Sequence, residues 1–193
     1  MKHGVYFYED DTFLIDNVAD FAKEGLERQE PVIIVATEQH RGDLKTKLTE
    51  NLVGLWAPAP RNYVTLDAST TLALFMRNSW PDDGLFLKVI GQIIRSAAGG
   101  KPVRIYGEMV AVLWAEGNTL AALHLERLWN KLASQQDFTL LCGYSASAFQ
   151  GPEMDYAFED VCSCHSQIQG VRASAQILVL PSQSQTEGAP PLA

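Results

Sequence analysis

The sequence has few cysteines and lacks basic runs, long apolar runs and a recognisable signal peptide. It contains only three cysteines in 193 residues, and no run of lysine or arginine is longer than one residue. No apolar run approaches the roughly 18 residues of a membrane span, and the N-terminal residues lack the apolar segment of a signal peptide. The formal net charge is -8. We therefore expect no membrane span, no direct contact with nucleic acid, and a cytoplasmic location with reduced thiols.

A phosphate-binding loop is also absent from the expected place. Such a loop puts Gly-x-x-x-x-Gly-Lys-Ser/Thr after the first strand, where backbone N–H groups cradle phosphate and lysine neutralises its charge. Here the first expected strand is followed by Glu9-Asp10-Asp11, three carboxylates that repel phosphate. The segment Gly99-Gly100-Lys101-Pro102 precedes a strand instead of following one. Nucleotide hydrolysis is therefore not expected.

Strand and helix patterns alternate along the chain. β-branched, aromatic or continuous apolar runs predict strands at 3–8, 32–36, 63–67, 103–107 and 138–142. Apolar residues at helical spacing predict helices at about 12–28, 82–98, 109–114, 119–136 and 155–167, and a charged surface helix is expected at 38–51. One more helix is expected to begin at Ser69 or Thr70 and to include Phe75 and Met76. The alternation predicts one α/β domain with three layers and a mainly parallel sheet.

The expected domain covers residues 1–170. Residues 171–193 are expected to form an extension, in which 177–180 can add a short edge strand. From Pro181 onward the sequence is polar and rich in proline and glycine, which favours disorder.

Acidic and aromatic residues follow the predicted strands. Ligands of open α/β sheets bind in the crevice beyond the carboxyl ends of the strands. Glu108 lies where strand 103–107 turns into helix 109–114, so its carboxylate is interpreted either as a ligand or cation contact or as a helix cap. If the first, fourth and fifth strands end side by side, Tyr8, Glu108, Trp114 and Tyr144 should line one cavity. Other residues that follow strands are Glu9, Asp10, Thr37, Glu38, Asp67 and Ser145.

Two tryptophans carry alternative interpretations. Glu126, Trp129 and Asn130 are spaced i, i+3 and i+4, so they share one helix face. They predict either a pocket wall or polar network, or a surface stripe with the indole packed at its edge. Trp114 follows a short helix near Glu108, where it can offer an apolar or cation-binding face to a ligand. Core packing is the alternative for Trp114.

Two motifs that suggest metal binding or catalysis are interpreted as structural. Cys162 and Cys164 are spaced i and i+2 and point in different directions on a helix, whereas zinc needs about four suitably spaced ligands. A buried helix histidine, His165, with two small apolar thiols is therefore favoured. Gly143-Tyr144-Ser145-Ala146-Ser147 is similar to a nucleophile elbow, but Ser147 replaces its second glycine. We expect no metal, no cofactor and no catalytic residue, and a structural role for His3.

Segments in the right order over about residues 3–168 resemble a known family. They are His3 to Asp11, Phe21 to Leu26, Glu30 to Val32, Gly107 to Val110, Leu113 to Asn118, Leu125 to Asn130 and Leu141 to Tyr144. Together they resemble the MEDS domain, the methanogen/methylotroph, DcmR-type sensory domain. The resemblance implies a fold similar to RecA and KaiC ATPases that has lost the phosphate loop. It also implies sensing of small molecules, including hydrocarbon derivatives, in bacterial and archaeal signalling proteins or transcriptional regulators.

These observations together predict a non-enzymatic sensory domain. We expect a small, mainly apolar or weakly cationic organic ligand, and a signalling partner such as a kinase or a regulator. A ligand shifts an equilibrium only through different affinities for two states. Two alternatives stay open: a degenerate RecA-type ATPase that uses Glu108, and a ligand-free interaction module for a kinase or an anti-sigma factor. The expected ligand-binding residues are Tyr8, Glu9, Asp10, Asp67, Glu108, Trp114, Glu126, Trp129, Asn130 and Tyr144.

Overall fold

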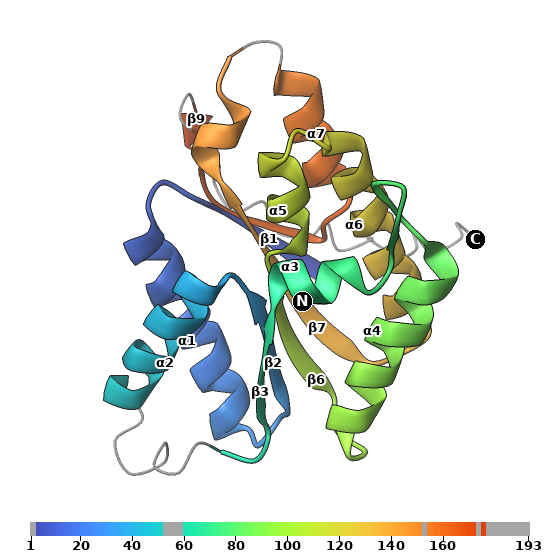
Figure 1. The fold of residues 1–193 in the computed structure, drawn as a ribbon. Helices are drawn as coiled ribbons and strands as arrows, with labels where there is room; N and C mark the ends of the chain where they lie inside the picture. The colour runs from blue at the N-terminus through green and yellow to red at the C-terminus, as the bar shows by residue number, and fades with distance from the viewer. Residues whose placement is uncertain (1–2, 52–59, 152–153, 173–174, 177–193) are drawn as a thin grey trace, which may run out of the picture.

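The structure, a computed structural model, describes residues 3–51, 60–151, 154–172 and 175–176. A central sheet carries helices on both faces, which confirms the predicted α/β arrangement of three layers (Figure 1). The edge strand expected at 177–180 and the tail expected from Pro181 lie outside the described residues.

Within the described residues, six strands of the sheet run parallel in the order β3-β2-β6-β7-β1-β8. The short strand β9 (Ala175–Gln176) pairs antiparallel with β8. All five residues of β2 are buried, as expected for a continuous apolar strand that is covered on both faces. The parallel strands are β1 (His3–Tyr8), β2 (Val32–Ala36), β3 (Tyr63–Asp67), β6 (Val103–Gly107), β7 (Phe138–Ser145) and β8 (Gln167–Arg172).

The helices divide between the two faces of the sheet. On one face lie α1 (Asp11–Glu27) and α2 (Glu38–Asn51), at the left of Figure 1. The predicted apolar face of α1 is confirmed, since Leu14, Val18, Phe21 and Gly25 are all buried. The other face is covered by α3 (Ala68–Ala73), α4 (Asp83–Ala98), α5 (Met109–Ala115), α6 (Thr119–Ala133), the 3₁₀ turn η1 (Ala146–Phe149) and α7 (Asp155–Ser163).

Helix α3 is shorter than predicted. It ends at Ala73, so Phe75 and Met76 lie beyond it. Met76 instead opens the short strand β4 (Met76–Arg77), which pairs antiparallel with β5 (Trp80–Pro81). The connecting residues Asn78 and Ser79 both have positive φ, the backbone conformation that tight hairpin turns of this kind require.

The last predicted helix is also too long. Helix α7 ends at Ser163, and His165 lies in the connection to β8 instead of within the helix. Strand β8 pairs with β1 from Gln167 to Gly170. It continues to Arg172, past the domain boundary expected at residue 170. The sequence of β8 alternates polar and apolar residues over its first part, which is typical of a strand with one exposed face.

The first, fourth and fifth predicted strands are neighbours, as expected: β7 lies between β6 and β1. Their side chains alternate between the two faces. Phe7, Cys142 and Tyr144 face the layer that contains α5 and α6. Tyr106 and Leu141 face the layer of α1 and α2. Residues near the carboxyl ends of adjacent strands can therefore lie close together along the sheet and still face opposite layers of helices.

Candidate functional site

Glu108 anchors a polar cluster at the carboxyl end of β6. Its side chain is almost fully buried and does not cap its own helix, α5. Oε1 accepts hydrogen bonds from His40 Nδ1 at 2.6 Å and from the Tyr106 hydroxyl at 2.9 Å. Oε2 accepts one from the backbone N–H of Thr37 at 2.8 Å. The interpretation of Glu108 as a cap of α5 is therefore wrong, because the carboxylate reaches across to the start of α2.

The environment of Glu108 controls the charge of the groups around it. The hydrogen bond to Glu108 raises the pKa of His40 to about 9, against the opposing effect of burial, and Asp11 at 3.4 Å from His40 Nε2 adds to the rise. Burial, followed by the negative charges of Glu108 and Asp11, raises the pKa of Tyr8 to about 12. Near neutral pH the cluster thus contains a protonated His40 between two carboxylates and a neutral Tyr8.

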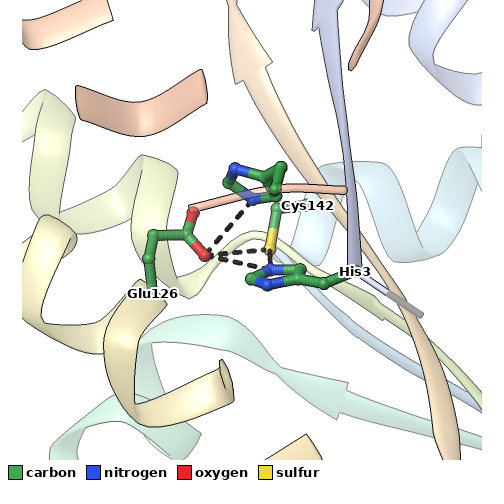
Figure 2. Close-up of side chains that lie close together, drawn as sticks. His3, Glu126 and Cys142 are labelled. Carbon is green, nitrogen blue, oxygen red and sulfur yellow. Dashed lines mark hydrogen bonds and ion pairs between the residues drawn. The ribbon is translucent and has the colours of Figure 1, made fainter. Parts of the chain in front are cut away.

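A second polar cluster lies on the opposite face, around Glu126 of α6. Glu126 is fully buried, and its Oε1 accepts a hydrogen bond from the Tyr144 hydroxyl at 2.9 Å. Figure 2 shows the carboxylate pointing toward His3 and Cys142. Its Oε2 lies 3.2 Å from His3 Nε2, 3.5 Å from Cys142 Sγ and 3.4 Å from His165 Nε2.

Asn130 extends this second cluster by one helical turn. Its Oδ1 lies 2.9 Å from His3 Nδ1 and accepts that proton, while its Nδ2 donates to the Cys164 carbonyl at 2.8 Å. The polar-network interpretation of Glu126 and Asn130 is confirmed, and the surface-stripe interpretation is wrong. Trp129 is buried but takes no part in the network, because it packs edge-on against Phe86.

In the second cluster, burial and neighbouring charges shift the pKa values of Glu126 and His165 in opposite directions. Burial tends to raise the pKa of Glu126, but the charges and hydrogen bonds of His165 and His3 hold it well below the ordinary value. Burial tends to lower the pKa of His165, and the Glu126 carboxylate raises it above the ordinary value. Burial, followed by the charge of Glu126, raises the pKa of the Cys142 thiol. The Glu126 carboxylate therefore shifts the pKa values of both His165 and Cys142.

Two carboxylates beyond the strands, Asp10 and Asp67, act as helix caps. Asp10 accepts hydrogen bonds from the backbone N–H groups of Thr12 and Phe13, at 2.9 and 3.2 Å, and so caps α1. Asp67 caps α3 through the N–H of Thr70 at 2.8 Å. Glu9 is exposed beside Asp10. Asp10 and Asp67 thus occupy helix N-termini, where a phosphate-binding protein would hold its anion.

The structure does not bring Glu108 and Tyr144 together. Tyr144 belongs to the core on the α5 and α6 face, while Tyr106, which bonds Glu108, belongs to the core on the other face. Trp114 contacts Tyr144 with a ring-centroid separation of 5.6 Å, in a buried aromatic cluster. This placement favours core packing for Trp114. The prediction that Glu108 and Tyr144 line one cavity is therefore wrong. The neighbouring strands end side by side, but these two side chains point to opposite faces of the sheet.

A groove of about 680 Å³ opens at the same edge of the sheet. One wall is α3 with the β4–β5 hairpin, and the other wall is α5 with the turn that leads to α6. Asn118 Nδ2 donates to the Ser79 carbonyl at 2.7 Å, which joins the two walls. Leu72, Met76, Val112 and Leu113 supply apolar surface, and Ser69, Ser79, Glu116 and Asn118 supply polar groups.

The chain matches the family described as MEDS: MEthanogen/methylotroph, DcmR Sensory domain, over residues 2–166. The match extends over most of the sequence, so the chain belongs to this family, and the resemblance seen in its motifs is confirmed. No match to the chain was found among curated proteins. Among the described helices, none has the length and apolar character required to cross a membrane.

Sequence reasoning did not identify several members of these clusters, among them His40, Tyr106 and Cys142. His40 lies in a charged surface helix, and nothing near it in sequence indicates its bond to a residue 68 positions away. Cys142 lies in a predicted strand two residues before Tyr144, and this spacing sets both side chains on the same face of that strand. The pairing of β1 with β7 then brings His3 close to it.

Proposed function

We propose that this chain is a non-enzymatic sensory domain that binds a small organic molecule and acts in bacterial or archaeal signal transduction or transcriptional regulation. The observation that carries the proposal is the family match, whose description names a sensory domain. In this proposal the fold is a RecA/KaiC-like domain that has lost its phosphate loop. The capping of α1 by Asp10 supports that part, because the helix N-terminus is already satisfied by a carboxylate.

We place the ligand in the groove between α3 and α5. Both helices follow strands of the parallel sheet, so the groove lies beyond the carboxyl ends, where ligands of open α/β sheets bind. Its volume falls in the range of small-molecule sites, about 300–1,000 Å³. The apolar side chains Leu72, Met76 and Val112 suit a mainly apolar molecule, and Glu116 suits a weakly cationic group.

The groove also offers a route from ligand to partner. The hydrogen bond between Asn118 and Ser79 holds the β4–β5 hairpin against the turn before α6. The same hairpin exposes Trp80, which is 44% exposed and stacks on His124 at 4.9 Å. A ligand that spreads or closes the groove would move this indole, which a kinase or a regulator can read as part of an interaction surface.

The test is a thermal-shift screen of small organic molecules, amines and nucleotides, followed by native mass spectrometry. A ligand present at about 100 times its Kd should stabilise the protein by about 2.7 kcal/mol. Ala73→Trp should abolish the shift, because Ala73 is an exposed residue that lines the groove. Ala115→Trp is the matched control, since Ala115 is an exposed alanine of α5 outside the groove.

Each outcome of the screen distinguishes between hypotheses. Stabilisation that Ala73→Trp removes and Ala115→Trp retains supports the groove. Stabilisation by Mg-ATP alone would favour the degenerate ATPase and contradict the proposal. If no compound stabilises the wild-type protein, a ligand-free interaction module for a kinase or an anti-sigma factor becomes the better description.

A further inference from the structure

Four side chains that can ligate a metal converge on the α6 face of the sheet. His3 comes from β1, Glu126 from α6, Cys142 from β7, and His165 from the connection between α7 and β8. One ligand atom of each lies within 4.8 Å of all the others. Figure 2 shows the sulfur of Cys142 and the ring of His3 on the same side of the Glu126 carboxylate. These groups lie outside the groove proposed for the organic ligand.

The separations of these atoms fit a tetrahedral site. Zn²⁺ bonds of about 2.0–2.3 Å place the ligand atoms of a tetrahedron roughly 3.3–3.8 Å apart. Glu126 Oε2 lies 3.2 Å from His3 Nε2, 3.5 Å from Cys142 Sγ and 3.4 Å from His165 Nε2. The His3 Nε2 to Cys142 Sγ distance is 3.5 Å. Four pairs of ligand atoms therefore already have approximately the spacing that one ion imposes.

Both histidines are oriented by a hydrogen bond at the other ring nitrogen. His165 Nδ1 lies 2.7 Å from the Val161 carbonyl, which can only accept, so Nδ1 carries the proton. His3 Nδ1 lies 2.9 Å from Asn130 Oδ1 and is held in the same way. In the neutral rings, each Nε2 thus presents its lone pair to the centre. Metal-ligating histidines are typically fixed by such outer hydrogen bonds.

The centre also contains an unsatisfied polar atom. Within the described residues, His165 Nε2 makes no hydrogen bond of good geometry; its side chain is fully buried, and the Glu126 carboxylate lies in ion-pair range, with Oε2 at 3.4 Å. An unpaired polar atom in such a place is destabilising, and coordination of a cation would satisfy it. Within the part of the chain that the structure describes, the ion pairs of Glu126 are with His3 and His165, and a cation at the centre would take over the balancing of this buried carboxylate.

From these observations, the geometry points to a metal site formed by His3, Glu126, Cys142 and His165, with Zn²⁺ as the ion that fits. Imidazole and thiolate ligands favour zinc over magnesium or calcium, which prefer oxygen. Binding releases the thiol proton of Cys142 to solvent, together with the Nε2 proton of His165 where that ring is protonated, and forms sulfur–metal and nitrogen–metal bonds. All four positions come from the protein, as in structural zinc sites. The ion would join β1, α6, β7 and the segment before β8.

This site revises the role of the Cys162-to-His165 motif. Among its members, only His165 belongs to the cluster, while the other ligands come from distant parts of the chain. The inference goes beyond the proposed sensory function and does not depend on it, since the metal centre and the organic ligand would occupy different places. Either can fail while the other holds.

The first test uses the full wild-type chain. The purified protein is treated with a strong chelator, reloaded with Zn²⁺, passed through a desalting column and measured by elemental analysis. We expect one zinc ion per chain to be retained, together with a higher melting temperature. Retention of no zinc, with a melting temperature that Zn²⁺ does not change, would overturn the site without any need for a variant.

The second test identifies the ligands by Co²⁺ substitution. Tetrahedral Co²⁺ bound to thiolate should give intense visible absorption and a sulfur-to-metal charge-transfer band in the near ultraviolet. Cys142→Ser should remove the charge-transfer band, whereas the matched variant Cys164→Ser should retain it. Cys164 is a half-buried cysteine nearby that contributes no ligand to the cluster. A band lost in Cys164→Ser and kept in Cys142→Ser would refute the assignment.

The outer hydrogen bond of His3 provides a third readout. Asn130→Ala removes the acceptor of His3 Nδ1, and should weaken zinc affinity roughly tenfold to a hundredfold in a chelator competition. His124→Gln changes a histidine on the same helix that pairs with Asp83 instead, and should leave the affinity unchanged. Equal affinities for Asn130→Ala and the wild type would contradict the proposed orientation of His3.

Discussion

The carboxylate of Glu108 lies 2.6 Å from Nδ1 of His40, although the two residues are 68 positions apart in the chain. This contact joins the end of β6 to the first turn of α2. Because Tyr106 and the backbone of Thr37 donate to the same carboxylate, Glu108 has three donors in a buried place. The bond keeps His40 protonated near neutral pH, which leads to a measurable dependence of stability on pH.

The free energy of unfolding should fall as pH rises above neutrality. The pKa of His40 is raised from an ordinary value of about 6.5 to about 9 in the folded protein. Its stabilisation is therefore complete below about pH 6.5 and is lost as pH rises through about 9. The loss should stay below about 3.5 kcal/mol, because the shift from 6.5 to about 9 corresponds to about 1.4 kcal/mol per pKa unit and solvent screens the pair. Urea unfolding across this range measures it.

The variant Glu108→Gln isolates this effect. The amide keeps the size of the side chain but removes the charge, so the pKa of His40 should return toward its ordinary value. The decline of stability between about pH 6.5 and about pH 9 should then become shallower. NMR titration of the His40 ring checks the same point directly, with the ring of His124 as internal control. An unchanged His40 titration in Glu108→Gln would contradict the assigned pair.

Gly143 makes room for the buried hydroxyl of Tyr106. A Cβ atom at Gly143 would lie 2.5 Å from the Tyr106 hydroxyl oxygen, so Gly143→Ala forces a buried ring to move. We expect a loss of about 1–3 kcal/mol in the free energy of unfolding. In the background Tyr106→Phe, which lacks that oxygen, the same change should cost about 1 kcal/mol less.

Gly107→Ala is the matched control for this cycle. Gly107 is another buried strand glycine, but a Cβ there meets nothing closer than 3.8 Å. Its substitution should change the free energy of unfolding by no more than about 1 kcal/mol. Equal costs for Gly143→Ala with and without the Tyr106 hydroxyl would show that the close approach is not the cause.

Asp10 caps the N-terminus of α1, the helix that follows the first strand of the sheet. Isothermal titration of the wild-type protein with Mg-ATP should therefore show no binding in the micromolar range. Asp10→Ala removes a helix cap and should lower the free energy of unfolding by about 1 kcal/mol, again without ATP binding. Glu9→Ala, next to it and exposed, is the control for stability. Micromolar binding, with turnover that Glu108→Gln abolishes, would establish the ATPase alternative instead.

The main sheet was predictable because most of its strands can be recognised from their own residues. The apolar run of β2 and the β-branched residues of β6 identify a strand without knowledge of any partner. Strand β8 was missed because helical spacing from Phe158 through Val161 to His165 continues past the true end of α7. The β4–β5 hairpin was missed because non-glycine residues, Asn78 and Ser79, adopt positive φ, which local sequence seldom indicates.

The site was less predictable, because its contacts depend on tertiary packing. The placement of Glu126 and Asn130 on one helix face follows from helical spacing alone. The approach of His3 and Cys142 depends on the register between β1 and β7, which a single sequence does not specify. The predicted cavity shared by Glu108 and Tyr144 is wrong because the two residues face opposite sides of the sheet. Adjacent strands put their ends together, but the alternation of side chains directed these two residues to opposite layers.

The most direct test of the sensory proposal is an NMR map of the compound that gives the largest thermal shift. Backbone amides of wild-type protein are recorded with and without this compound. We predict that shift changes concentrate on α3, the β4–β5 hairpin and the turn from Gly117 to Asn118, and that they disappear in Ala73→Trp. Changes confined to α1 and α2 around His40, or no changes at saturating concentration, would contradict the proposed groove.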